Sequence, residues 1–137
     1  MIFSELNYIG VVAGAILSMV LGFLWYGPLF SKPWAALAGL GPEKIESAKS
    51  KMGVTYSFTF VLALITSLVM QDVVRVFGII TIQEALTLGF VLWAGLSGAA
   101  FFMNGTFEQK PLRLILIDSG YYLVQFVMLS VLFTFWV

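Results

Sequence analysis

Four long runs of apolar residues dominate this sequence, and they are almost free of charged side chains. They extend over Leu6–Ser31, Met52–Gln71, Ala85–Phe107 and Leu114–Val137, and only the last contains a charged residue, Asp118. A helix needs about 20 apolar residues to cross the hydrocarbon core of a bilayer, and each run approaches or exceeds that length. Strict alternation of apolar and polar residues is missing, which argues against a membrane β-barrel.

The composition supports the same class. Of the 137 residues, 61% are hydrophobic and 10% are charged, whereas soluble domains carry roughly 25% charged residues. We therefore predict an all-α polytopic membrane protein, a single domain over residues 1–137. Its bundle of four transmembrane helices has spans at about 6–30, 52–74, 82–107 and 113–136, with a short interfacial helical segment between the first two.

The junctions between the runs carry helix-capping signals. Pro42 followed by Glu43 is typical of a helix start, because proline fits the first position and an acid suits the first turn. Gly78 is suited to the left-handed position after the second span. Thr81 and Glu84 have the spacing of a capping box, which predicts that the third helix begins near residue 82.

Lysine and arginine are distributed unevenly between the two ends of the predicted bundle. Six of them fall in the loops after spans one and three, and only Arg75 falls on the other side; the six are Lys32, Lys44, Lys49, Lys51, Lys110 and Arg113. The positive-inside rule then places both loops in the cytoplasm and both termini outside. The N-terminal MIFSELNYIG has no basic region, so we expect no cleaved signal peptide.

Absent residue types limit the chemistry. The chain has no cysteine, no histidine and zero net charge. We therefore expect no disulfide, metal site or cofactor of the usual kinds, and no nucleic-acid partner. No nucleophile–base spacing or phosphate-binding loop is recognisable, so we expect no enzymatic activity.

A polar layer is predicted near the cytoplasmic face, centred on Asp118. This residue lies five positions after Arg113, so roughly 7–8 Å deeper along the helix. Asp118, Tyr121, Tyr122 and Gln125 share one helix face. The number of residues between a charged loop residue and a side chain gives the depth of that side chain in the membrane. By this count, Tyr26, Ser57 and Asn104 lie at a depth similar to that of Asp118. The candidate binding residues are Asp118, Asn104, Tyr26, Tyr121, Tyr122, Gln125, Ser57, Trp25 and Lys32.

Several roles are open for Asp118. A carboxylate inside the membrane costs about 2.5–3.5 kcal/mol, so it requires a partner or a function. Partners could be the Asn104 amide, a tyrosine hydroxyl, the indole N–H of Trp25 or Trp34, or Lys32. The layer is then either a clasp joining spans three and four to span one, or a proton, ion or ligand site. A neutral, protonated Asp118 is a third possibility.

The stretch LWYGPLFSKPW, from Leu24 to Trp34, ends the first span. Pro28 disfavours helical geometry at Gly27, so the helix should end or kink there. Aromatic residues around the break, Trp25, Tyr26, Phe30 and Trp34, are typical of a belt at the membrane interface. A broken backbone at membrane depth is tolerated where protein or water lines it, so we interpret this stretch as the rim of the polar layer.

Small residues recur every fourth position along the first span, at Gly10, Gly14, Ser18 and Gly22. We call this stripe the small-residue face. Small residues allow helix backbones to approach closely in lipid, so the stripe predicts a helix contact, either within the chain or between subunits.

Two segments resemble each other weakly. GPLFSKPW from Gly27 and GTFEQKPL from Gly105 share glycine, lysine and proline at matching positions. Both would end an odd-numbered span on the same side, as in a parallel duplication. Similar interface requirements favour such a match arising by chance, and a true repeat is left open.

LWYGPLFSKPW together with NGTFEQKPLRLILIDSGYYLV resembles the bacterial membrane-protein family catalogued as domain of unknown function 1761, over nearly the whole chain. The family pattern falls on Trp25, Tyr26, Gly27, Pro28, Phe30, Lys32, Trp34, Asn104, Phe107, Glu108, Pro111, Asp118, Gly120 and Tyr121. Ser31 and Gly105 depart from it. The resemblance implies four spans and a bacterial origin, with no established activity.

Two functions follow as hypotheses. The first is a non-enzymatic structural or accessory protein of the bacterial inner membrane, with the polar layer as a clasp. The alternative is an oligomeric transporter or channel that uses the layer as its site. The expected partners are the lipid bilayer, a second copy of the chain, with a dimer favoured, and a small-molecule, ion or lipid ligand.

Overall fold

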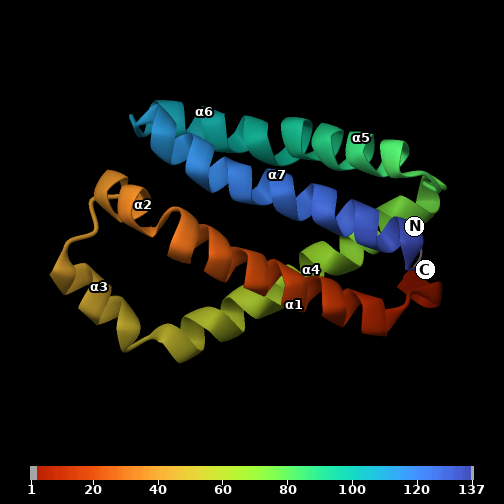
Figure 1. The fold of residues 1–137 in the computed structure, drawn as a ribbon, viewed down its shortest axis with the longest axis horizontal. Coiled ribbons are helices and arrows are strands. Elements are labelled where there is room, and N and C mark those ends of the chain that lie inside the picture. The colour runs from red at the N-terminus through yellow and green to blue at the C-terminus, as the bar shows by residue number, and fades with distance from the viewer. Residues whose placement is uncertain (1–2, 137) are drawn as a thin grey trace.

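A computed structural model describes residues 3–136, and helices account for nearly all of them (Figure 1). A short 3₁₀ turn, η1 (Phe3–Glu5), is followed by α1 (Tyr8–Leu24), η2 (Trp25–Leu29), α2 (Ser31–Leu37), α3 (Pro42–Lys49), α4 (Met52–Val76), α5 (Ile82–Leu92), η3 (Trp93–Gly98), α6 (Ala99–Phe107) and α7 (Leu112–Phe135). No strand occurs within residues 3–136. The predicted all-α class is confirmed.

Four helical stretches in this structure are long and apolar enough to cross a membrane. They are Tyr8–Leu29, Met52–Val76, Ile82–Phe107 and Leu112–Phe135. The first and third are composite, because η2 continues α1 and η3 joins α5 to α6. Their boundaries lie within a few residues of the spans expected from sequence.

The first span passes through Gly27–Pro28 instead of ending there. Pro28 has no N–H to donate, and the backbone widens locally so that the Phe30 N–H reaches the Trp25 carbonyl at 3.0 Å, five residues back. A widened turn of this kind absorbs the break in the α-helical ladder. The chain then bends at Phe30 (φ −130°, ψ 13°) into α2.

Local capping chemistry sets the other helix ends. The Asn7 side chain accepts from the Gly10 N–H and starts α1. Thr81 and Glu84 form the complete capping box at the start of α5. After α4, Gly78 takes φ +65° while its N–H and that of Ile79 bond to the carbonyls of Arg75 and Val74. This is a Schellman motif, which requires the left-handed conformation that glycine adopts at low cost.

The central helix of the bundle is α7. It contacts α1, α2, α4, α5, η3 and α6, whereas α1 pairs mainly with α4 and α5 mainly with α7. In Figure 1, α7 runs between the α5–α6 helix and the crossing pair α1 and α4. The core at the terminal end contains Met70, Val74, Leu129 and Phe133. The helix that carries Asp118 is therefore the one that most of the bundle packs around.

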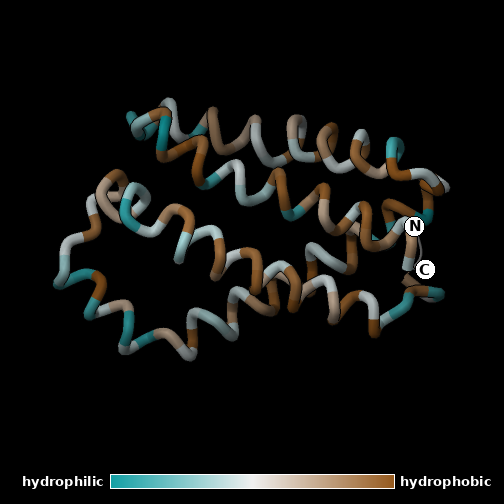
Figure 2. The backbone as a smooth tube through the Cα atoms, viewed as in Figure 1, coloured by the Kyte–Doolittle hydropathy of each residue, from teal (hydrophilic) through white to brown (hydrophobic). Residues whose placement is uncertain are grey.

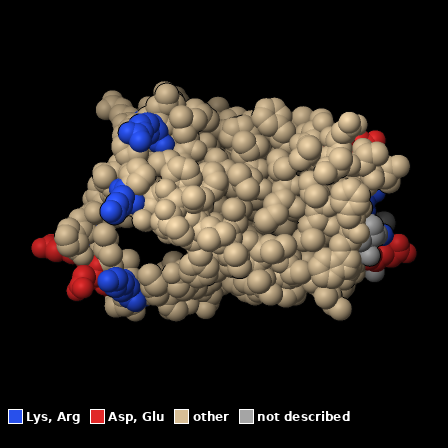
Figure 3. Space-filling model, in the orientation of Figure 1, with Lys and Arg blue, Asp and Glu red and all other residues tan. Residues whose placement is uncertain are grey.

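Polar and charged residues collect at the two ends of the molecule. Figure 2 shows apolar backbone positions along the middle of the helices, and Figure 3 shows charged side chains at both ends with an uncharged band between them. Large apolar side chains are exposed on this band, among them Ile9, Ile16, Phe58, Ile65 and Leu96. An exposed apolar band on long apolar helices fits a membrane protein.

The small-residue face of α1 lies inside the bundle. Gly10, Gly14 and Ser18 are buried and Gly22 is half-buried. A Cβ at Gly14 would collide with Ser67 Oγ of α4 and would come within 2.9 Å of Leu129 and 3.0 Å of Phe133 of α7. The stripe is therefore occupied by helices of the same chain, and the alternative of a subunit interface along it does not fit this packing.

Candidate functional site

Asp118 joins α7 to the segment that ends the first span. Its Oδ1 accepts two hydrogen bonds, from the Tyr26 hydroxyl at 2.9 Å and from the Trp34 indole Nε1 at 3.0 Å. The two donor rings also pack edge to face, with their centroids 5.2 Å apart. One carboxylate oxygen thereby holds η2 and α2 against α7, and we call this arrangement the Asp118 clasp.

The proline-containing turn places the donors of the clasp. Because η2 is widened and the chain bends at Phe30, Tyr26 and Trp34 approach α7 from two different helices. Trp25, next to Tyr26, donates its indole N–H to the Ile117 carbonyl at 2.8 Å. Trp25 was a candidate partner for the carboxylate, and the structure gives it this backbone partner on the preceding residue instead.

A second widened turn holds α7 from the opposite side. In η3 the Ala99 N–H bonds to the Ala94 carbonyl, five residues back. Trp93, at the start of this segment, donates its indole N–H to the Ser119 carbonyl at 2.8 Å. Trp25 and Trp93 therefore bind carbonyls on either side of Asp118 in α7.

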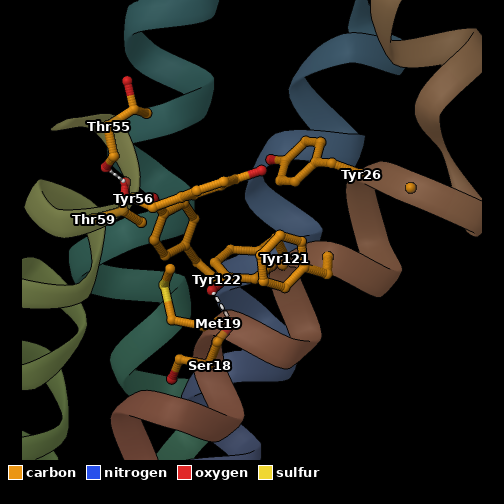
Figure 4. A pocket seen from close by; sticks show the side chains of 11 residues that line it. Ser18, Met19, Tyr26, Thr55, Tyr56, Thr59, Tyr121 and Tyr122 are labelled. Carbon is orange, nitrogen blue, oxygen red and sulfur yellow. Dashed lines mark hydrogen bonds between the residues drawn. The ribbon is translucent and has the colours of Figure 1, made fainter. Parts of the chain in front are cut away.

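A cavity of about 420 Å³ lies beside the clasp, between α1, η2, α4 and α7. In Figure 4 the aromatic side chains from these helices point into the space between them. Its walls are apolar surface and hydroxyl groups, without a charged side chain; they include Ser18, Tyr26, Tyr56, Thr59, Tyr121 and Tyr122. The volume lies within the range of about 300–1,000 Å³ that is usual for small-ligand sites.

Hydrogen bonds and ring contacts order the tyrosines at the cavity. The Tyr121 hydroxyl donates to the Ser18 carbonyl at 2.8 Å, which ties α7 to α1. Tyr121 and Tyr122 pack edge to face with centroids 4.9 Å apart, and the Tyr122 ring also contacts Phe101. The polar layer predicted from sequence is thus assembled around Asp118, Tyr26, Tyr121 and Tyr122.

Other predicted members of the layer lie elsewhere. Asn104 is exposed on α6, because the neighbouring Gly105 turns inward against Ile115 of α7. No hydrogen bond within residues 3–136 connects the Asn104 amide to Asp118. Lys32 is exposed on α2, and Ser57 is exposed and donates to the Gly53 carbonyl of its own helix at 2.8 Å.

Gln125 lies deeper in the bundle than the clasp. Its side chain is 3% exposed, and its Oε1 has no hydrogen-bond partner in the described part of the chain. It shares a helix face with Asp118 but lies nearly two turns further along α7. It therefore belongs to the interior of the bundle and does not line the cavity.

Sequence reasoning missed a second polar region near the chain termini. Gln71 of α4 accepts from the Asn7 N–H at 2.8 Å and donates to the Asn7 carbonyl at 3.1 Å, so it joins α4 to the start of α1. Asp72, next to it, is 2% exposed and lies within α4. Asp118 is therefore not the only acid inside a span. The signal in the sequence is the Gln71–Asp72 pair, which stands at the end of the second apolar run.

The arrangement offers hydrogen bonding and an uncharged cavity. No group of three metal-ligating side chains occurs within the described residues. Asp118 has its Oδ1 engaged by two donors, and the hydroxyls of Tyr26 and Tyr121 already donate within the chain. The geometry can hold helices together and can accommodate a largely apolar molecule.

Comparison with known proteins identifies the family of this chain. No curated protein and no solved structure matches the chain. A family model described as "Protein of unknown function (DUF1761)" matches residues 9–134, which include both widened turns and the whole Asp118 clasp. The family resemblance inferred from the Trp25–Trp34 and Asn104–Tyr121 stretches is thereby confirmed. This chain belongs to the DUF1761 family.

Proposed function

We propose that this chain is a non-enzymatic structural or accessory protein of the membrane, in which the Asp118 clasp stabilises the fold. The observation that carries the proposal is the double acceptance at Asp118 Oδ1, by donors from η2 and α2. Each donor lies more than 80 residues away in sequence, so the clasp joins the two halves of the chain. Intramembrane polar groups commonly pair across helices in this way.

Two substitutions at Asp118 test the clasp. Asp118→Asn keeps a carbonyl oxygen that accepts both hydrogen bonds, so it should melt close to the parent. Asp118→Leu leaves the Tyr26 hydroxyl and the Trp34 indole N–H unpaired, which should lower the free energy of unfolding by about 1–3 kcal/mol per group. Melting temperatures in one neutral detergent measure the difference.

Matched substitutions at the exposed Glu46 are the control, because Glu46→Asn and Glu46→Leu change the same groups without a buried partner. The clasp would be disproved by an Asp118→Asn variant that melts as low as Asp118→Leu.

The cavity supports a second candidate, transport of a small molecule or ion through an oligomer. Under this alternative Asp118 serves as a charge, and Asp118→Asn removes the charge while keeping the shape. Flux of monovalent cations into protein-containing liposomes should then fall to background in Asp118→Asn. Equal cation flux into liposomes that contain the parent protein and into protein-free liposomes would contradict an ion pathway.

We further propose that the chain forms homodimers. The large apolar side chains on the outer face of α4, such as Val54 and Phe58, lie beyond the contacts made within the chain. A second copy would be held on this face by side-chain packing between helices, which drives helix association in lipid. Light scattering coupled to size exclusion, corrected for detergent, tests this state, and a monomer mass at all protein concentrations would contradict it.

A further inference from the structure

The cavity between α1, α4 and α7 combines an apolar wall with unused hydrogen-bond donors. Tyr26 and Tyr121 donate to Asp118 and Ser18, whereas within residues 3–136 no hydrogen bond engages the hydroxyls of Tyr56 and Tyr122. Both of these side chains line the cavity (Figure 4). Their O–H groups can donate to an acceptor such as an ester carbonyl oxygen.

Two lysines lie close in sequence to residues that line the cavity. Lys51 lies one helical turn before Thr55, which lines the cavity from α4. Lys32 lies in α2, five residues after Gly27 on the opposite wall. Both lysines are exposed, and neither forms an ion pair with a carboxylate of the described residues.

Basic side chains exceed acidic ones at this end of the molecule. It holds six Lys and Arg side chains, against the three exposed acids Glu43, Glu46 and Glu108. In the space-filling view an opening separates the α1–α2 side from the α3–α4 side, and basic side chains lie above and below it (Figure 3). An anionic group is the complement of this rim.

We infer that the cavity binds one anionic phospholipid. One of its two acyl chains lies between α1 and α4, its ester carbonyl oxygens accept from Tyr56 and Tyr122, and its phosphate lies between Lys32 and Lys51. The occupant is a lipid because the cavity lies between long apolar helices and has no charged side chain in its wall. It reaches Gly27 and Thr55, near the end of the molecule where basic side chains exceed acidic ones. This goes beyond the proposed structural role and does not depend on the Asp118 clasp.

Native mass spectrometry from a neutral detergent tests the inference. Dioleoyl phosphatidylglycerol and dioleoyl phosphatidylcholine have the same acyl chains and differ in net charge. The parent should retain one phosphatidylglycerol at concentrations where phosphatidylcholine is lost. Lys32→Gln and Lys51→Gln should each weaken phosphatidylglycerol binding about fivefold, the usual contribution of one basic residue at an anionic membrane surface.

Gly22→Leu tests the cavity itself. A Cβ at Gly22 lies 3.7 Å from Tyr121, an ordinary contact, so the rest of the leucine projects into the cavity and should abolish retention of the lipid. Gly95→Leu is the matched control, since nothing lies within 4 Å of its Cβ and it lines no part of the cavity. Circular dichroism verifies that each variant is folded.

Three results would overturn the inference. Equal retention of the two lipids would show that the site does not select an anionic headgroup. A protein dimer without bound lipid would show that a second copy of the chain, and not a lipid, occupies the cavity. Parent-like phosphatidylglycerol binding by Gly22→Leu and by both lysine variants would place the lipid elsewhere. If Gly22→Leu does not fold, phosphatidylglycerol binding by Lys32→Gln and Lys51→Gln still tests the inference, because both lysines are exposed. None of these results alters the melting behaviour expected of the Asp118 variants.

Discussion

Asp118 shows how one half-buried acceptor can organise several donors. Its Oδ1 accepts hydrogen bonds from the Tyr26 hydroxyl and the Trp34 indole N–H. The carbonyls of the neighbouring Ile117 and Ser119 accept hydrogen bonds from the indole N–H groups of Trp25 and Trp93. An aromatic donor brings a large apolar surface together with one polar atom. Such donors can therefore satisfy the polar groups of α7 while presenting little polarity to the surrounding lipid.

Gly14 provides a prediction at the same scale. Its missing side chain leaves room for Ser67, Leu129 and Phe133, so any larger residue overpacks the contact between three helices. Gly14→Leu should lower the free energy of unfolding by about 1–3 kcal/mol, and Gly14→Ala should act in the same direction. The measurement is thermal unfolding in detergent.

The control for Gly14 is Gly53, which lies at the start of α4 with nothing within 4 Å of its Cβ. Gly53→Leu should leave the melting temperature nearly unchanged. A Gly14→Leu variant that melts with the parent would mean that this face of α1 is not closely packed.

At the scale of elements, the two widened turns serve one purpose. Each breaks the α-helical ladder of an odd-numbered span and aims a tryptophan at α7. Widened turns recur at functional positions in helices. Only η2 contains a proline, so the two turns arise from different local sequences even though their tryptophans bind carbonyls of Ile117 and Ser119 within one turn of the same helix.

Trp93→Phe tests this role for η3. The phenyl ring keeps most of the bulk against Gly98 but cannot donate to the Ser119 carbonyl. We expect a loss of about 0.5–1.5 kcal/mol in the free energy of unfolding, the usual net contribution of one hydrogen bond. Denaturant melts followed by circular dichroism measure it. Trp136→Phe, near the end of the chain, is the control, and equal effects from the two substitutions would contradict the assigned role.

The similarity between Gly27–Trp34 and Gly105–Leu112 does not extend to local structure. The first segment is helical on both sides of Phe30, and its matching proline, Pro33, lies within α2. The second leaves α6 through Gln109 at φ 55° and enters α7 directly after Pro111. Matching glycine, lysine and proline therefore support different turns in the two places.

At the scale of the whole molecule, both termini lie at one end and the α2–α3 and α6–α7 connections lie at the other (Figure 1). Arg75, the single basic residue near the termini, pairs with Glu5 at 3.2 Å. The basic residues thus divide six to one between the two ends. By the positive-inside rule we expect the end with α2 and α3 in the cytoplasm.

Cysteine labelling tests this orientation. The chain has no cysteine, so Ser47→Cys in α3 and Gln83→Cys in α5 each introduce a single exposed thiol. A membrane-impermeant maleimide should label Gln83→Cys in intact cells and Ser47→Cys only after the membrane is permeabilised. Labelling of Ser47→Cys from outside intact cells would reverse the orientation.

The sequence alone determined the class of the molecule and several of its helix ends. Long uncharged runs require lipid as solvent, and the helix signals at Pro42, Gly78 and Thr81 act through neighbouring residues. Such features are local, so they can be interpreted without the fold. Asp118, Tyr26 and the Gly27–Pro28 break could be placed in one polar layer from the sequence as well, because the depth of a residue along its helix follows from its distance to the charged loop residues.

Only the tertiary structure decided which side chains meet. Trp34 rather than Asn104 binds Asp118, Asp72 is buried, and α7 is the central helix. Each of these depends on the rotation of a helix about its own axis. In water, an amphipathic pattern sets that rotation. In a bilayer, lipid and protein interior are equally apolar, so it is set by close packing, as at Gly14 and Gly105, which the pattern of apolar residues does not encode.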